Sequence, residues 1–201
     1  KAATLAHPLN PGLHVLEKID IRELALYIDW TYFFFAWKIS GKYPAIFNDP
    51  VKGVEAKKLF DDGQKYLKII IDQKLIEAKA VFGLYPAVSD GDDVKVFSDG
   101  DNKELKLVLR FLRNQEPKEK GVPNLSLADY IAPETSGLTD TIGAFVSTVA
   151  IDNEAFGKFR DDDYATIMIR ILSDRLAEAA AEWLHEKIRR EYWGYAADEN
   201  L

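Results

Sequence analysis

The stretch that decides the fold is residues 78–112, AKAVFGLYPAVSDGDDVKVFSDGDNKELKLVLRFL. It contains three runs typical of β-strands, at 78–85, 94–97 and 105–112. The segments between the runs are short and rich in Asp, Gly and Asn, which favours tight turns between antiparallel strands. These segments include residues 90–93 and 99–102. The pattern predicts an antiparallel meander, and a further β-rich run at 142–151 extends the sheet.

Helical patterns lie on both sides of these strands. Asp20 and Glu23 have the spacing of an N-cap and its N3 partner, and residues 54–74 have the periodicity of an amphipathic helix. A long amphipathic helix is predicted from about Tyr164 to Tyr192. Its apolar stripe consists of Leu172, Leu176, Ala179, Ala180, Trp183, Leu184 and Ile188. The predicted fold class is α+β: a twisted, mostly antiparallel sheet packed with helices, including this long C-terminal helix.

Two segments are predicted to be irregular. Residues 1–20 contain Pro8, Pro11 and Gly12 and are interpreted as a lead-in to a single domain that spans 1–201. Residues 114–126 are polar, contain two prolines and a glycine, and are interpreted as a loop.

Composition excludes several classes of protein. The formal net charge is -7, which disfavours binding to a phosphate backbone, so no nucleic-acid partner is expected. The sequence contains no cysteine, which excludes disulfides, thiolate metal sites and cysteine nucleophiles. No apolar run reaches the length of a membrane span, and no signal peptide is recognisable. We expect a cytoplasmic protein without a membrane partner.

Motifs for phosphate and metal binding are missing or incomplete. Neither the dinucleotide fingerprint nor the Walker pattern occurs. The segment from His185 to Arg189 resembles the zinc-protease helix motif, but Arg189 replaces the second histidine. Glu182 and His185 have di-iron spacing, yet such a site needs the motif twice. We expect no metal site, nothing local in the sequence supports a Ser-His-Asp triad, and no catalytic residue is assigned.

Two carboxylates are candidate binding residues. Asp29 lies inside an unusually aromatic run, Asp29 to Trp37, where an acid either faces a pocket that holds a cationic ligand or is an exposed residue at a helix end. Glu178 lies on the predicted long helix, and the residues alone favour a solvated helix face for it.

Six sequence blocks carry a resemblance to a known family. They are IDWT (28–31) with GKYP (41–44), SLADYIAP (126–133), IGAF (142–145), DRLAEA (174–179), LHE (184–186) and RREYWGYA (189–196). In this order they resemble the activation domain of cobalamin-dependent methionine synthase, and they extend over nearly the whole chain. Tyr32 departs from the family pattern, in which we expect proline. We also expect that the chain is cut short after Asn200, before a family segment with an arginine and a Gly-Tyr-Pro motif.

The resemblance implies a function in methionine biosynthesis. Such a domain binds S-adenosylmethionine as methyl donor for the reductive methylation of cob(II)alamin, and it is part of a methyltransferase. The cobalamin is held by a neighbouring domain of the same parent chain, and flavodoxin or a similar reductase supplies an electron. By motif match Asp29 contacts S-adenosylmethionine through its amino group, and Glu178 is a carboxylate of the same pocket. The alternative is a non-catalytic docking module for the cobalamin domain or the reductase.

Overall fold

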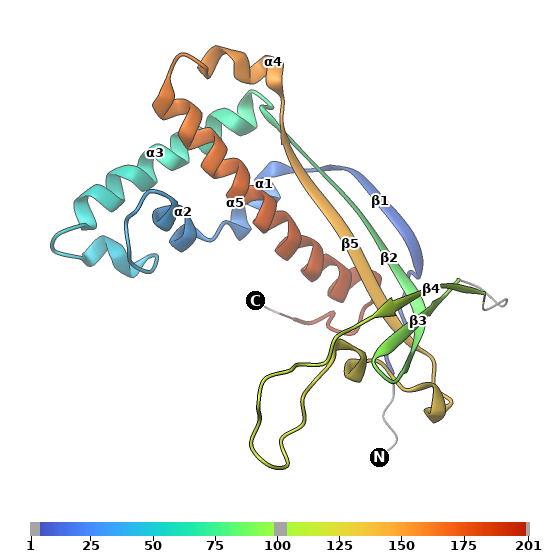
Figure 1. Cartoon of the computed structure of the whole chain (residues 1–201). Helices are drawn as coiled ribbons and strands as arrows, with labels where there is room; N and C mark the ends of the chain where they lie inside the picture. Colours follow the sequence, from blue (N-terminus) through green and yellow to red (C-terminus); the bar gives the residue numbers. More distant parts are fainter. Residues whose placement is uncertain (1–4, 99–103, 200–201) are drawn as a thin grey trace. The chain divides into compact units, whose positions relative to one another are not determined.

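The structure is a computed structural model of the chain, and it describes residues 5–98 and 104–199. The strands are β1 (Gly12–Ile19), β2 (Ile76–Asp90), β3 (Asp93–Phe97), β4 (Leu105–Arg110) and β5 (Asp140–Ile151). The helices are α1 (Ile21–Leu24), α2 (Trp30–Ala36), α3 (Gly53–Asp72), α4 (Asn153–Phe156) and α5 (Asp163–Lys187), and a π-helical turn (Ile188–Tyr192) follows α5. Figure 1 shows these elements along the chain. Within the described part of the chain, no helix has the length and apolar character needed to cross a membrane.

The strands form one sheet in the order β1-β2-β3-β4, and β5 also pairs with β2. β2 and β3 are antiparallel, as are β3 and β4. Asp90 pairs with Asp93, so a two-residue turn connects β2 to β3, and Gly91 adopts the positive φ of 63° that this tight turn requires. The predicted α+β class and meander are therefore confirmed. The segment predicted between β3 and β4 at 99–102 lies outside the described residues.

The prediction of an irregular lead-in over residues 1–20 is wrong, because Gly12–Ile19 is strand β1. The sequence of β1 follows two prolines, begins with a glycine and carries adjacent charges at Glu17 and Lys18, so its strand signal is weak. Its strand conformation comes from hydrogen-bonded pairing with β2, a partner more than 50 residues away in sequence. Tertiary pairing here overrides a weak local preference.

The chain forms two compact units. We call residues 15–81 and 146–186 the helical unit, and residues 1–14, 82–145 and 187–201 the hairpin unit. β1, β2 and β5 contribute residues to both units.

Helix α5 supplies much of the core of the helical unit. Every residue of the stripe predicted for the long helix is buried, from Leu172 to Ile188, and Leu172, Leu176 and Leu184 are completely inaccessible. Trp183 is also buried, and its indole Nε1 donates a hydrogen bond of 3.0 Å to Glu23 Oε2. Helix α5 contacts α3 where Tyr164 Oη donates to Asp62 Oδ2 over 3.2 Å. The long amphipathic helix is thus confirmed, with π-helical geometry in its last predicted turn.

The core of the hairpin unit is smaller. Ala87, Val94, Val96 and Ala128 are buried together, and Tyr85, Leu109, Phe111, Ile131 and Ile142 pack around them. No helix or strand occurs within 111–126, so the predicted loop at 114–126 is confirmed. Ser126 begins the short 3₁₀ turn at Leu127–Tyr130 with a capping box completed by Asp129.

Candidate functional site

Asp29 is the N-cap residue of α2 and belongs to the helical unit. Its backbone is extended, with φ −75° and ψ 99°, and its Oδ1 accepts hydrogen bonds from the backbone N–H groups of Thr31 (2.8 Å) and Tyr32 (3.4 Å). Aspartate is among the residues most favoured at this position, because its side chain satisfies donors that the helix leaves unpaired. Asp29 is exposed, and its Oδ2 accepts no hydrogen bond from any described residue. One carboxylate oxygen is therefore available to a ligand.

The aromatic run around Asp29 fixes the position of α2. Trp30, Phe33 and Phe34 are buried, and the Trp30 ring lies 4.8 Å from the ring centroid of Phe60 on α3 in an edge-to-face arrangement. Gly63 on α3 allows this close packing, because a Cβ atom there would lie only 3.0 Å from Phe33 Cζ. The candidate carboxylate is thus held at the end of a helix that packs tightly on α3.

Glu178 lies on α5 in the same unit and forms an ion pair with Arg175. The arginine Nη1 and Nη2 atoms donate to the two carboxylate oxygens of Glu178 over 2.6 and 2.9 Å. The Arg175 guanidinium also lies 5.9 Å from the ring centroid of Tyr32, a cation–π contact. Because the Tyr32 N–H donates to Asp29, a continuous series of contacts connects the two predicted residues.

Both carboxylates are exposed. Glu178 lies on a solvated helix face, as its residue pattern favoured, and Asp29 is a residue at a helix end, one of the two alternatives left open for it. Sequence reasoning missed Arg175 and Tyr32 as parts of this arrangement. The spacing of Arg175 three residues before Glu178 on a helix was a usable signal. The contact with Tyr32 had no local signal, since it joins residues far apart in the chain.

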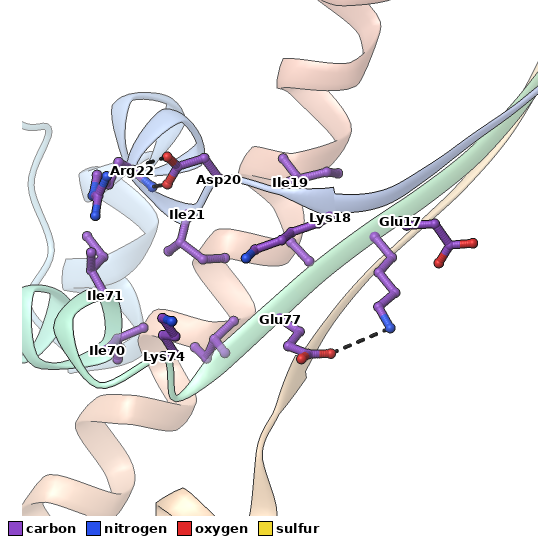
Figure 2. A pocket seen from close by; sticks show the side chains of 13 residues that line it. Glu17, Lys18, Ile19, Asp20, Ile21, Arg22, Ile70, Ile71, Lys74 and Glu77 are labelled. Carbon is purple, nitrogen blue, oxygen red and sulfur yellow. Dashed lines mark hydrogen bonds and ion pairs between the residues drawn. The ribbon is translucent and has the colours of Figure 1, made fainter.

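A hollow of the helical unit lies elsewhere. A pocket of about 510 Å³ is lined by the end of β1, the start of α1, the end of α3 and the start of β2. Figure 2 shows Ile19, Ile21 and Ile70 in its wall, together with the paired Asp20 and Arg22. Neither Asp29 nor Glu178 lines it. Its size alone assigns no function.

A second hollow, of about 410 Å³, is also in the helical unit. Trp37, Asp62 and Tyr164 are among its lining residues. The hydrogen bond from Lys65 lowers the pKa of Asp62, and burial raises the pKa of Tyr164. The Asp62 shift comes mainly from a contact within α3, and neither predicted carboxylate lines this hollow.

No metal centre is built by the residues that the structure describes, because none of their His, Asp and Glu side chains gather in groups of three or more that could hold an ion. The Glu182 and His185 pair of the sequence analysis lies on α5 without such a group.

Comparison with known proteins identifies the family. The family model described as "Vitamin B12 dependent methionine synthase, activation domain" matches residues 20–201. A solved structure, the crystal structure of the MetH reactivation domain bound to AdoHcy, is 42% identical in sequence with a TM-score of 0.91. That match covers all of this chain and 62% of the solved chain. Because the family match extends over nearly the whole sequence, this chain belongs to the family of vitamin B12 dependent methionine synthase activation domains.

Proposed function

We propose that this chain is the reactivation module of a cobalamin-dependent methionine synthase and that it binds S-adenosylmethionine. One observation carries the proposal: the chain matches, over its full length and at 42% identity, a reactivation domain that was solved with AdoHcy bound. AdoHcy is S-adenosylhomocysteine, which remains when S-adenosylmethionine has given up its methyl group. Similarity at this level over a complete chain supports a shared ligand.

The candidate site suits the amino acid end of such a ligand. S-adenosylmethionine carries an ammonium group, a carboxylate and a sulfonium. Asp29 offers an oxygen without a protein donor, and Glu178 adds a second carboxylate. A carboxylate that accepts a hydrogen bond from an ammonium group forms a charge-assisted bond, which is stronger than a neutral one. We therefore assign the ammonium group of the ligand to Asp29, with Glu178 beside it.

The residues of this chain bind and orient, and they need not move a proton. S-adenosylmethionine supplies a methyl group, and a cobalamin held by a neighbouring domain accepts it. Rate enhancement in such a transfer depends on alignment of donor and acceptor. Asp29 is suited to that task because capping fixes its side chain and tight packing fixes α2. The cobalamin-binding domain of the parent chain and a flavodoxin-type reductase are the partners that we propose.

A second candidate is a docking module that binds the cobalamin domain or the reductase and does not bind S-adenosylmethionine by itself. The observation that favours it is the 62% coverage of the solved relative, because ligand contacts of that relative can lie on the portion that this chain does not span. The methyltransferase activity belongs to the parent enzyme under both proposals, and the isolated chain is expected to be inactive.

Calorimetric titration with S-adenosylmethionine and S-adenosylhomocysteine separates the two functions. We would compare this chain with a longer form of the parent polypeptide that has the length of the solved relative. Asp29→Asn in the longer form should weaken binding by about tenfold to a hundredfold, because a charge-assisted hydrogen bond contributes about 1.5–3 kcal/mol and each decade costs about 1.4 kcal/mol. The shorter chain should bind more weakly than the longer form.

Asp152→Asn is the matched control for this titration. Asp152 is also an exposed N-cap, and it accepts hydrogen bonds from the backbone N–H groups of Glu154 and Ala155, each over 2.9 Å. It lies outside the candidate site, so its replacement should leave affinity unchanged. Equal affinity of the unchanged longer form and its Asp29→Asn variant would show that Asp29 is not a ligand contact. Absence of binding by both chain lengths would favour the docking module.

A further inference from the structure

Arg175 has an unusual environment for one member of an ion pair on a helix. Its side chain is only 15% exposed, whereas that of its partner Glu178 is 60% exposed. Its guanidinium donates bidentate hydrogen bonds to both oxygens of the carboxylate. This geometry fixes the orientation of the Glu178 side chain as well as its position. The less exposed member of the pair therefore sets the geometry of the more exposed member.

Tyr32 extends the arrangement toward Asp29. The Tyr32 ring covers the Arg175 guanidinium at 5.9 Å, and the Tyr32 backbone N–H donates to Asp29 Oδ1 at 3.4 Å. The Tyr32 ring is also held by an edge-to-face contact with Phe35, 5.9 Å away on the same helix. One aromatic residue of α2 thus contacts both the cap that carries Asp29 and the arginine that holds Glu178.

The Arg175 Nε atom is buried and has no hydrogen-bond partner among the described residues. An unpaired buried donor lowers stability, so structural stabilisation alone gives a poor account of this arginine. The charges give a better one. Asp29, Glu178 and Arg175 together carry one net negative charge, which complements a single ammonium group. Without the arginine, Glu178 would be free to rotate.

We propose that Arg175 is a positioning residue: with its guanidinium packed against the Tyr32 ring, it orients Glu178 toward the ammonium group of an α-amino acid ligand. This inference rests on the proposed function, since it concerns the amino acid end of the same ligand. Under this proposal, the Arg175–Glu178–Tyr32 arrangement affects binding of the amino acid end of the ligand and does not affect binding of its nucleoside end.

The test compares two ligands by calorimetry in the longer form of the polypeptide. S-adenosylhomocysteine has the amino acid end, and 5′-methylthioadenosine lacks it. Arg175→Met should weaken binding of S-adenosylhomocysteine about tenfold and leave the affinity for 5′-methylthioadenosine unchanged. In the unchanged chain, Glu178→Gln should weaken binding of S-adenosylhomocysteine by a similar factor. In the Arg175→Met background, the same substitution should weaken that binding by less than about twofold. Arg175→Lys keeps the charge and loses the bidentate hydrogen bonds. Compared with Arg175→Met, it should restore only part of the affinity for S-adenosylhomocysteine.

Each outcome decides between explanations. If Arg175→Met weakened the binding of both ligands equally, the role of Arg175 would be merely structural and the inference would be overturned. Unchanged binding of S-adenosylhomocysteine in Arg175→Met would overturn it as well, while leaving the proposed function in place. Failure of the unchanged protein to bind S-adenosylhomocysteine would overturn the proposed function, and this inference with it. Asp29→Asn should keep its effect in the Arg175→Met background, because the α2 cap orients Asp29 independently.

Discussion

The helical unit and the hairpin unit illustrate two different kinds of stabilising contact, apolar burial and a network of ion pairs. In the helical unit, α5 buries a continuous apolar stripe, and the aromatic residues of α2 pack on α3. In the hairpin unit, the side-chain hydrogen bonds of one arginine connect the loop at 111–126 to the residues around it. Arg113 donates to Asp92 Oδ1 (2.6 Å), to Asp129 Oδ2 (2.7 Å) and to the backbone oxygen of Asn124 (2.6 Å).

This difference shows which kind of change, loss of side-chain volume or protonation, should destabilise each unit. Apolar burial is lost when volume is removed, and it responds little to protonation. A network of ion pairs contributes less stability when it is exposed, and it depends on the charge of its carboxylates. The two candidate carboxylates are themselves exposed, and the elements that carry them, α2 and α5, are held by apolar burial in the helical unit.

Trp183→Ala is expected to have the largest effect, because it removes a large side chain from the core of the helical unit. Trp183 is 8% exposed and donates to Glu23, so truncation leaves both a cavity and an unpaired carboxylate oxygen. The free energy of unfolding should fall by about 3–5 kcal/mol. Urea denaturation measures it, with Glu182→Ala on the exposed face of α5 as the control that should change little. A loss below about 1 kcal/mol would mean that the stripe is not core.

A smaller loss is expected from removal of the cap on α2. Asp29→Ala deletes the acceptor of the Thr31 and Tyr32 N–H groups and should cost about 0.5–2 kcal/mol. Asp29→Asn should cost little, because asparagine caps helices as well as aspartate does. Thermal unfolding of both variants measures the difference. A large loss in Asp29→Asn would show that the charge itself stabilises the fold, and the ligand titrations of that variant would then need correction for stability.

Much of the fold could be predicted because its signals are local. The stripe of α5, the turn at Gly91 and the loop at 114–126 follow from periodicity and from turn residues. Strand β2 was predicted to end at Tyr85, just before proline, yet it continues to Asp90. Pro86 has no N–H to donate, and the pairing with β3 begins only at Ala87, so the strand loses no bond of that ladder there.

The candidate site could be predicted only in part. Asp29 and Glu178 were identified by motif match, and the structure adds how each is held. The role of Asp29 as an N-cap has a local origin, since it needs only the N–H groups of Thr31 and Tyr32. The contact between Tyr32 and Arg175 joins residues 143 positions apart and exists only when α2 and α5 lie side by side. No periodicity or spacing rule encodes such a pair. Strand β1 likewise depends on pairing with β2, which is distant in sequence.

The last prediction concerns the hairpin unit and its dependence on pH. The hydrogen bonds from Arg113, and then that from the Ser126 N–H, lower the pKa of Asp129 from 3.8 to about 2. A carboxyl group whose pKa is lower in the folded state stabilises that state above its unfolded pKa, and the contribution is lost as pH falls through the folded pKa. The loop should therefore keep its order at pH 5 and lose this contribution progressively between about pH 4 and pH 2.

Amide exchange of Asn114 reports on this loop, because its N–H donates to the Leu125 oxygen over 2.9 Å. Asp129→Asn should lower the protection of this amide at pH 5, and the difference from the unchanged protein should disappear toward pH 2, where Asp129 itself becomes protonated. Glu134→Gln is the control, since Glu134 is an exposed carboxylate of the same unit that pairs with Lys95 instead of Arg113. A difference that persists unchanged at pH 2 would assign the effect of Asp129→Asn to packing or to the capping box at Ser126, and the Arg113 network would then not be what orders the loop.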